Sequence, residues 1–318
     1  LVAVSAWYIV LPKVIGGKIF SDSLARLVVI LIVILNVPGG FHHQIVDPGF
    51  TEGLKFMHLF MSAAIAFPSL MTAFALFATL ERAGRSKGGK GLFGWFFKLP
   101  WKDVRFITIM LAMISFIFGG AGVIAQTNNQ LNQVVHNSMW VVGHFHVTVG
   151  VAVVLTFFGL MYWLIPHLSG RIMTAKIHNL GIWQTMFWTV GMLFMTISMS
   201  AVGLIGSPRR TEYTTYGDSA TALGWDPYLL FVGAGGTLLF IGVVIMVYIV
   251  FNLMFFAPKG YTEFMAASDE GLHHTPKWTE NWGLWIVLAI VIISMGYVVP
   301  IIDIIENAPP GSPPIRTW

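Results

Sequence analysis

The chain has 318 residues, of which 56% are hydrophobic and only 10% are charged, and its net charge is +4. Because soluble domains average about 25% charged residues, this composition predicts an integral membrane protein embedded in a lipid bilayer, with no nucleic acid as partner. The chain contains no cysteine, which excludes disulfides and thiolate chemistry, so any metal must be held by His, carboxylate or Met side chains.

The first expected element is a partial membrane helix over residues 1–12. The chain opens LVAVSAWYIVLPK, with no initiator Met and no signal-peptide pattern, so we expect a C-terminal portion or one piece of a split subunit. About 20 apolar residues cross a hydrocarbon core of about 30 Å, and such runs are expected to be helical. Seven runs follow, at 24–41, 55–81, 104–127, 138–166, 179–205, 227–257 and 281–304.

These runs predict an all-α, polytopic membrane helix bundle that forms a single membrane domain over residues 1–318. The Pro-rich tail at 306–318 is expected to lie along the surface. Lys and Arg are concentrated in alternate loops, with 14 of the 18 basic residues on one side, which the positive-inside rule makes cytoplasmic. Those loops are 13–26, 82–105, 167–178 and 258–280.

The stretch HNSMWVVGHFHVTVG at 136–150 carries histidines inside an otherwise apolar helix. His144 and His146 are two residues apart and project about 200° apart, so each can serve a different planar cofactor on its own side of the helix. His is a common axial ligand of haem iron. Gly143 is expected to let a flat ring approach the backbone. The alternative is that both histidines bond to neighbouring helices.

A second cluster, GGFHHQIVDPG at 39–49, contains His42 and His43. At a helix end the backbone can turn so that both imidazoles converge, and imidazole suits copper, iron and zinc. His136 and the pair Arg209–Arg210 lie on the same side of the membrane. Arg makes bidentate bonds to carboxylates such as haem propionates, although a lipid phosphate is the alternative partner.

Hydroxyl side chains interrupt the apolar helices in the cytoplasmic half and the middle of the membrane. With water, a chain of hydroxyls can pass protons, because each hydroxyl donates and accepts. Ser and Thr also bond to their own helix carbonyls without such a role. The candidates are Tyr8, Ser21, Ser69 and Thr72.

Together, GFHHQ and HNSMWVVGHFH resemble subunit I of the haem-copper oxidases. The stretches YIVLPK, SDSLAR, PSLMTAF, GKGLFGW and SPRR resemble the B-type (ba3-type) cytochrome c oxidases. The resemblance covers nearly the whole chain, is strongest over 1–210 and thins after about 215. It implies part of a bundle of about twelve or thirteen helices in a prokaryotic plasma membrane.

The resemblance implies that His42 and His43 are two of three ligands of the active-site copper. His144 is then the proximal ligand of a high-spin haem, of a or o type, and His146 is an axial ligand of a low-spin b-type haem. It further implies propionate binding by His136, Arg209 and Arg210, and a proton-input pathway through Tyr8, Ser21, Ser69 and Thr72.

Some family features are absent from this sequence. The third copper ligand, its linked tyrosine and the second low-spin haem ligand are expected upstream of Leu1, in the remaining part of subunit I. Asn132 stands where relatives often have Asp, and Val4 and Ala75 stand where relatives can have hydroxyls, so the proton chain is expected to use water or Ser5.

The function implied is a terminal oxidase that reduces O2 to water with electrons from cytochrome c, delivered by a subunit II with a dicopper centre, and coupled to proton uptake and pumping. A nitric oxide reductase, with iron in place of copper, and a quinol oxidase are alternatives from the same superfamily. A non-catalytic haem-binding electron carrier and a transporter are alternatives of a different class.

Overall fold

The computed structural model describes residues 1–36, 39–47, 49–210, 216, 219–263, 278 and 281–306. All regular elements within these ranges are helical, and the β-type pairings among them are two isolated bridges. The predicted tail at 306–318 lies outside the described residues after Glu306. The α-helices are α1 (Val2–Val14), α2 (Asp22–Asn36), α3 (Glu52–Ala64), α4 (Ala66–Ser86), α5 (Val104–Thr127), α6 (Asn129–Val135), α7 (Met139–Phe145), α8 (Val154–Ser169), α9 (Ala175–Leu204), α10 (Ala220–Leu223), α11 (Asp226–Phe251) and α12 (Trp282–Glu306).

Among the described residues, the segments η1, η2 and η4 are helical with a different winding. A short 3-10 helix, η1 (Phe96–Lys98), lies between α4 and α5, and a π-helix, η4 (Asn252–Phe256), extends α11. The π-helix η2 (His146–Val153) joins α7 to α8, so these three form one continuous span from Met139 to Ser169.

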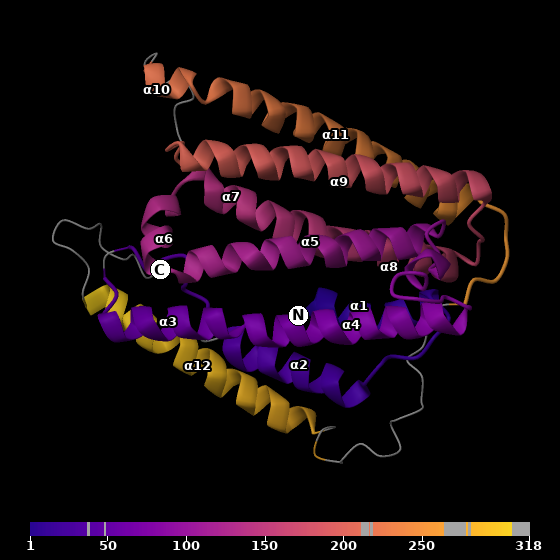
Figure 1. Cartoon of the computed structure of the whole chain (residues 1–318), viewed down its shortest axis with the longest axis horizontal. Coiled ribbons are helices and arrows are strands. Elements are labelled where there is room, and N and C mark those ends of the chain that lie inside the picture. The colour runs from indigo at the N-terminus through magenta and orange to yellow at the C-terminus, as the bar shows by residue number, and fades with distance from the viewer. Residues whose placement is uncertain are drawn as a thin grey trace.

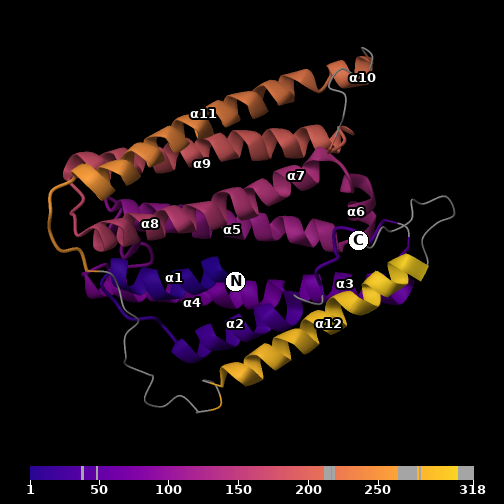
Figure 2. The same cartoon turned by 180° about the vertical axis from the view of Figure 1, so that it is seen from behind.

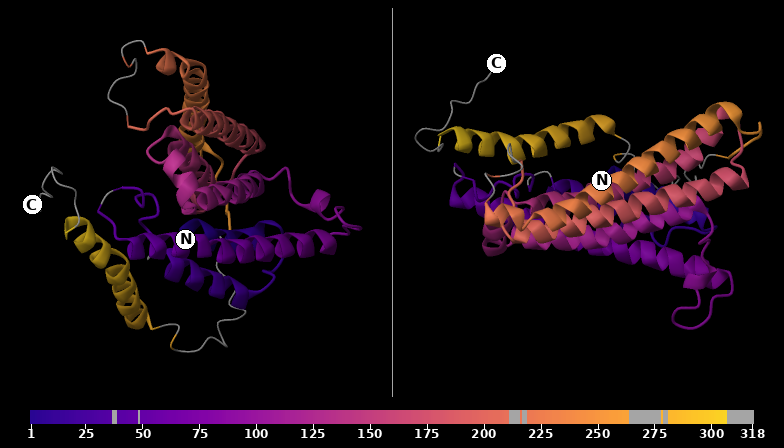
Figure 3. Two further views of the ribbon diagram at one scale, coloured as in Figure 1. Left: turned by 60° about the vertical axis from the view of Figure 1, so that its left-hand side comes forward. Right: turned by 90° about the horizontal axis from the view of Figure 1, so that it is seen from above.

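The long helices lie side by side in layers. Figure 1 shows α9 and α11 as one pair, α5 with α7 and α8 in the middle, and α1 to α4 below them. The view from behind (Figure 2) shows α12 crossing the outside of α2 and α3, and the turned views (Figure 3) separate the α1–α4 layer from the α5–α11 part. The main buried core includes Trp7, Leu80, Phe106 and Leu155 and lies where α1, α4, α5 and α8 meet.

Six helices in the described part are long and apolar enough to cross a membrane. They correspond to six of the seven predicted spans, and α5 begins and ends where the sequence predicts. The predicted span at 24–41 is too long, because α2 ends at Asn36 and has 15 residues. The sequence VPGG that follows contains residues unfavourable for a helix interior, which explains the early end.

The span Glu52–Ser86 is interrupted at Ile65, between α3 and α4. Pro68 lies in the first turn of α4, and a proline has no N–H to bond the carbonyl four residues back. The interruption at Ile65 is therefore a consequence of Pro68.

Close helix pairs are formed through glycines. A Cβ at Gly191 of α9 would lie 2.8 Å from the Gly235 carbonyl oxygen of α11, and a Cβ at Gly203 would overlap the backbone of Trp140 in α7. Without a hydrophobic driving force in lipid, helix association depends on such close packing at small residues. These contacts hold α9 against both α7 and α11.

Candidate functional site

The histidine pair lies in a series of turns between α2 and α3. The N–H of His42 donates to the Gly39 carbonyl at 3.2 Å, which begins the turn. The imidazole ring centroids of His42 and His43 are 4.0 Å apart and their planes are tilted by 51°. The predicted convergence of adjacent histidines at a helix end is what the structure shows.

Each ring of the pair is oriented through its Nδ1. His42 Nδ1 lies 2.8 Å from the Gly39 carbonyl oxygen and 3.0 Å from the Ser62 hydroxyl, and His43 Nδ1 lies 2.5 Å from Gln126 Oε1 of α5. Because carbonyl oxygens only accept, both Nδ1 atoms carry the proton, and the Nε2 atoms are left with lone pairs. Acceptors placed behind the ring in this way fix the tautomer of metal-binding histidines.

Asn132 fastens the histidine turn to the end of α5. Its side-chain Nδ2 donates to the Gln126 carbonyl at 2.5 Å and to the His42 carbonyl at 3.3 Å, and the residue is buried. Burial, followed by the charge of His42, lowers the pKa of His43 to about 4, so the ring is neutral at physiological pH. A neutral imidazole is the form that binds a metal ion.

His144 faces the same region from α7. Its ring centroid is 6.2 Å from that of His43, and its ring stacks on Trp140 with centroids 5.8 Å apart. The Nδ1 atom is buried and has no hydrogen-bond partner among the described residues. The ring fits because Gly122 of α5 has no side chain, since a Cβ there would overlap Nδ1.

Gly143 does not face an open space where a flat ring could approach the backbone, as the sequence predicts. A Cβ at this residue would lie 2.5 Å from the Ser200 hydroxyl oxygen and 2.8 Å from the Thr196 carbonyl oxygen, so Gly143 faces α9. The prediction that it admits a flat cofactor is wrong. Its role is helix packing, and Gly122 on the facing helix makes room for the His144 ring.

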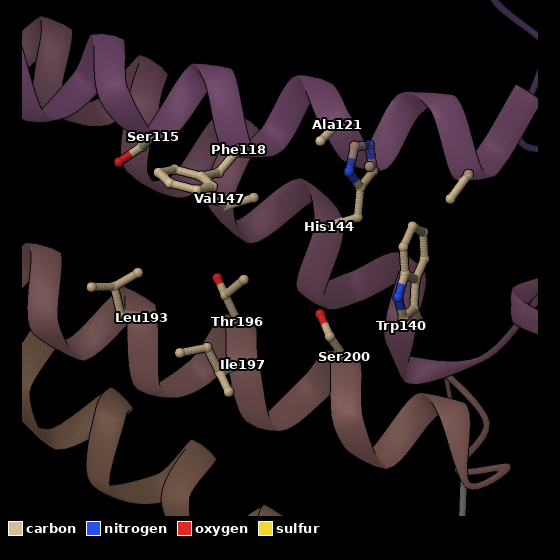
Figure 4. Close-up of a pocket in the computed structure, with 12 residues that line it drawn as sticks. Ser115, Phe118, Ala121, Trp140, His144, Val147, Leu193, Thr196, Ile197 and Ser200 are labelled. Atoms are coloured by element: carbon tan, nitrogen blue, oxygen red, sulfur yellow. The ribbon is translucent and has the colours of Figure 1, made fainter.

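A cavity of about 490 Å³ adjoins His144 between α5, α7 and α9. In Figure 4, His144 and Trp140 project from α7 toward α5, while Thr196 and Ser200 border the cavity from α9. Apolar side chains make most of the remaining wall. They include Phe118, Ala121, Val147, Leu193 and Ile197.

His146 begins the π-helix η2. Its Nδ1 lies 2.7 Å from the Val142 carbonyl oxygen one turn earlier, so Nδ1 donates and Nε2 carries the lone pair. Its ring stacks on that of Phe145, with centroids 5.2 Å apart. The ring is thus oriented by its own helix, whereas the ring of His144 packs against α5.

His136, Arg209 and Arg210 lie together at one end of the bundle. His136 Nε2 is 2.7 Å from an oxygen of Asp47, and Asp47 also acts electrostatically on Arg209. The Arg209 N–H donates to the Asn137 carbonyl at 2.8 Å, and its Nε donates to the Asn137 side-chain oxygen at 3.0 Å. Burial, and then neighbouring Arg210, lower the pKa of Arg209, while Asp47 opposes this.

Two of the four predicted hydroxyls are adjacent. The Tyr8 hydroxyl is buried next to Thr72, without a bond of normal geometry, and Thr72 donates to the Pro68 carbonyl at 2.9 Å. Ser21 instead caps α2, since its oxygen accepts from the Leu24 N–H at 3.2 Å. Ser69 is half-buried on α4, one turn before Thr72.

Thr79 connects the Ser21 segment to this face of α4. It is fully buried, accepts from the Phe20 N–H at 3.0 Å and donates to the Ala75 carbonyl at 2.7 Å. Thr79 lies two turns beyond Thr72 on the same helix face. Thr79 is therefore a further buried hydroxyl on the same face of α4 as Thr72, bonded to the segment next to Ser21, and sequence reasoning missed it.

The residues present fit imidazole-bound metals. Buried His144 borders an apolar cavity, and because its Nδ1 lies against Gly122, the ring fits an iron porphyrin through Nε2. The Nδ1-protonated His42 and His43 likewise fit copper through Nε2. Among the described residues no three His, Asp or Glu side chains are grouped closely enough to hold a metal ion. The position of the third copper ligand upstream of Leu1 stays a prediction.

Sequence reasoning also missed the residues that surround the histidines. Gln126, Ser62, Gly122 and Asp47 each contact a predicted site residue. A buried amide near the end of an apolar helix was the available signal for Gln126, because an intramembrane polar residue indicates a functional site. No comparable signal marked Gly122, since the chain has 33 glycines.

Comparison with known proteins leads to the same family. The family described as cytochrome c and quinol oxidase polypeptide I matches residues 1–238. A cytochrome c oxidase subunit 1 of Thermus thermophilus is 34% identical over 320 residues, which cover 98% of this chain and 56% of that protein. Quinol oxidase subunit 1 of Sulfolobus acidocaldarius is 22% identical over 64% of this chain and 37% of that protein.

A solved structure of a heme-copper terminal oxidase dimer has a similar fold. The TM-score is 0.85 at 30% identity, and the match covers 99% of this chain and 57% of that one. The chain thus spans little more than half the length of these relatives. The similar fold and the family match both agree with the motifs GFHHQ and GHFH, so the resemblance predicted from the sequence is confirmed. This chain belongs to the cytochrome c and quinol oxidase polypeptide I family, the subunit I family of the haem-copper oxidases.

Proposed function

We propose that this chain forms the oxygen-reducing centre of a terminal respiratory oxidase, working together with the rest of subunit I. The observation that carries the proposal is the convergence of three imidazoles from two segments, the histidine turn before α3 and helix α7. The rings of His42 and His43 are 4.0 Å apart, and the His144 ring is 6.2 Å from that of His43. Ionisable side chains within membrane segments are rare and indicate a functional site, and imidazole is a common ligand of copper and iron.

In this proposal His42 and His43 bind the copper ion and His144 binds the high-spin haem iron. His146 would bind the iron of a low-spin haem from the same helix. The copper and the two haems would supply electron transfer and O2 reduction. Gln126 and Ser62 hold the copper ligands in the Nδ1-protonated tautomer. Cytochrome c, acting through a subunit II with a dicopper centre, is the proposed electron donor.

The basic group at one end of the bundle is proposed to bind the haem propionates. His136 and Arg209 are held by Asp47 and Asn137, so their positions are fixed before any carboxylate binds. Arg210 has a left-handed backbone conformation, with φ at 58°, which turns the chain immediately after Arg209. An anionic group near these residues gains charge-assisted hydrogen bonds.

Proton delivery is proposed to start near Ser21, where Thr79 of α4 bonds the neighbouring Phe20, and to run along α4 toward the histidines. Thr79 and Thr72 lie on one face of α4, Tyr8 adjoins Thr72, and Ser62 at the end of α3 bonds His42. Ser69 lies on α4 one turn from Thr72. Hydroxyls that lie one or more helix turns apart do not bond to each other directly, so protons pass between them only through intervening water molecules.

The replacement His43→Ala in the intact complex tests the metal assignment. We expect loss of one copper atom per complex with both haems retained, because His144 and His146 are untouched. His178→Asn is a matched control, since His178 accepts the Val104 N–H far from the site. Full copper content in the His43→Ala complex would contradict the proposal.

A quinol oxidase is the second candidate, because a quinol oxidase subunit is among the similar proteins. The two candidates differ in the electron donor. Steady-state turnover with reduced cytochrome c, compared with turnover on a reduced quinol, distinguishes them. Finding iron rather than copper at His42 and His43 would instead favour a nitric oxide reductase.

A further inference from the structure

The span that carries His144 and His146 changes its winding at His146. α7 ends at Phe145, the π-helix η2 runs from His146 to Val153, and α8 continues from Val154. In a π-helix each N–H reaches the carbonyl five residues back instead of four, and such segments are frequent at functional sites. The directions in which the side chains of His146 and the following residues leave the helix depend on this change of winding.

The return from π to α winding leaves one carbonyl without a backbone donor. The N–H of Val154 bonds the carbonyls of Val149 and Val151. In the α-helix that follows, the N–H of Leu155 reaches four residues back, which is again Val151. The Gly150 carbonyl is therefore skipped, and a buried carbonyl without a donor costs free energy.

Trp188 of α9 supplies the missing donor. Its indole Nε1–H donates to the Gly150 carbonyl at 2.8 Å. The helices approach closely here because residue 150 has no side chain, since a Cβ there would lie 2.9 Å from the sulfur of Met192. The indole is fixed on its other side by Phe158, with ring centroids 5.1 Å apart in an edge-on arrangement.

Two threonine hydroxyls in this region donate to carbonyls of their own span, although Thr156 also accepts from Trp7 Nε1 of α1 at 2.8 Å. Thr148 donates to the His144 carbonyl at 3.2 Å, and Thr156 donates to the Ala152 carbonyl at 2.6 Å. A threonine bonded to its own helix can form such a bond under either winding. The bond from Trp188 differs because it joins two helices at the carbonyl that the π-to-α transition exposes.

We propose that Trp188 is a positioning residue for His146, acting by stabilising the π-helix that begins there. The π-helix is held at its start by the bond from His146 Nδ1 to the Val142 carbonyl, at 2.7 Å, and near its end by the bond from Trp188 to Gly150. Loss of the second bond favours local rewinding of η2, which turns the His146 ring relative to His144. The link to haem rests on the proposed function, whereas the link to the π-helix does not.

The test uses Trp188→Phe in the intact complex, with Trp183→Phe as the matched control. Trp183 lies on the same helix, but its side chain is 62% exposed. Backbone hydrogen exchange over residues 146–155 reports the π-helix without reference to any cofactor. The electron paramagnetic resonance g-values and midpoint potential of the low-spin haem report the orientation of the His146 ring.

We expect Trp188→Phe to speed exchange in 146–155 several-fold and to shift the g-values and potential of the low-spin haem, while the high-spin haem keeps its spectrum. Trp183→Phe should match the wild type in all three. Exchange and low-spin haem signals that do not differ between the two variants would overturn the proposal. A wild-type complex in which His146 binds no haem would overturn the proposed function, and the exchange result would still decide the role of Trp188.

Two further variants apply if the Trp188→Phe complex does not assemble. Trp188→Gln keeps an N–H donor on a smaller side chain, and Trp188→Met removes it at similar size. Assembly with Gln and failure with Met supports the hydrogen bond as the cause. If neither assembles, the volume of the indole is what the fold requires, and the proposal is overturned.

Discussion

Gln126 and His43 are 83 positions apart in the sequence, yet Gln126 Oε1 lies 2.5 Å from His43 Nδ1. The amide nitrogen of the same Gln126 side chain is buried without a hydrogen-bond partner among the described residues. One half of the amide therefore fixes the tautomer of a proposed copper ligand. The other half is a donor directed into the interior beside the histidine pair.

Replacing Gln126 by Leu is expected to weaken copper binding about 10–100-fold, the usual effect when a metal-binding histidine loses the hydrogen-bond partner that orients it. Gln126→Glu keeps an oxygen acceptor for His43 Nδ1 and should retain most of the affinity. Copper release during titration with a chelator measures both effects. Gln130→Leu, at an exposed position of α6, is the control. Equal copper affinity in the Leu and Glu variants would show that the bond does not support the metal ligand.

Adding one methyl group at Gly122 is expected to displace the His144 ring. A Cβ at this residue overlaps His144 Nδ1, and overpacking of this kind costs about 1–3 kcal/mol. The Gly122→Ala complex should lose or shift the absorption of the high-spin haem and keep that of the low-spin haem. Gly120→Ala is a matched control, because no atom lies within 4 Å of the added Cβ. Similar spectra in both variants would contradict the position proposed for His144.

Tyr8→Phe is expected to slow proton-coupled turnover without destabilising the fold. The Tyr8 hydroxyl is buried and makes no hydrogen bond of normal geometry among the described residues, so its removal breaks no bond. We expect turnover to fall about tenfold, which corresponds to ~1.4 kcal/mol in the barrier. Proton uptake kinetics and thermal unfolding check the two parts, with Tyr248→Phe on the exposed side of α11 as control. Unchanged proton uptake would remove Tyr8 from the pathway.

Asp103→Ala is expected to cost about 1 kcal/mol, because Asp103 caps α5. Its carboxylate accepts from the Arg105 N–H and Arg105 Nε, both at 2.9 Å. Burial by itself raises the pKa of Asp103, but the hydrogen bonds and charge of Arg105 outweigh it, and the pKa is below its usual value of 3.8.

Since the folded pKa of Asp103 lies below the unfolded one, its stabilising effect is fully present above the unfolded pKa. The effect is lost as the pH falls through the folded pKa. The unfolding temperatures of wild type and Asp103→Ala should therefore differ at pH 7 and converge as the pH falls through the folded pKa, which lies below 3.8. Asp22→Ala, at an exposed helix start, is the control and should change little. A constant difference at all pH values would contradict the ion-pair explanation.

Most of the membrane helices could be predicted from hydropathy alone. Long apolar runs must be helical in lipid, because every backbone group has to be bonded within its own segment. Hydropathy does not show where a helix ends, so the span at 24–41 was predicted too long. The orientation expected from the basic loops stays a prediction.

The side chains around the histidines could not be predicted. Ser62 and Gln126 contact His42 and His43 across 20 and 83 positions, and no local pattern contains such distances. The wrong prediction for Gly143, which faces α9 instead of a cofactor, also arose because a local pattern does not show which helix packs against a residue. A helix gives the angle between neighbouring residues, but only the packing of α5 and α9 against α7 decides which side holds a cavity and which holds a helix.

By itself the sequence determined the membrane helices and the imidazoles at positions 42, 43, 144 and 146, because hydrophobicity and residue type are local properties of the chain. The tertiary structure decided that the rings of His42, His43 and His144 converge and that Gly122 makes room for His144. It also decided that η2 is wound as a π-helix bonded by Trp188. These are relations between distant segments, and they exist only after helix packing has selected which carbonyls, amides and rings meet.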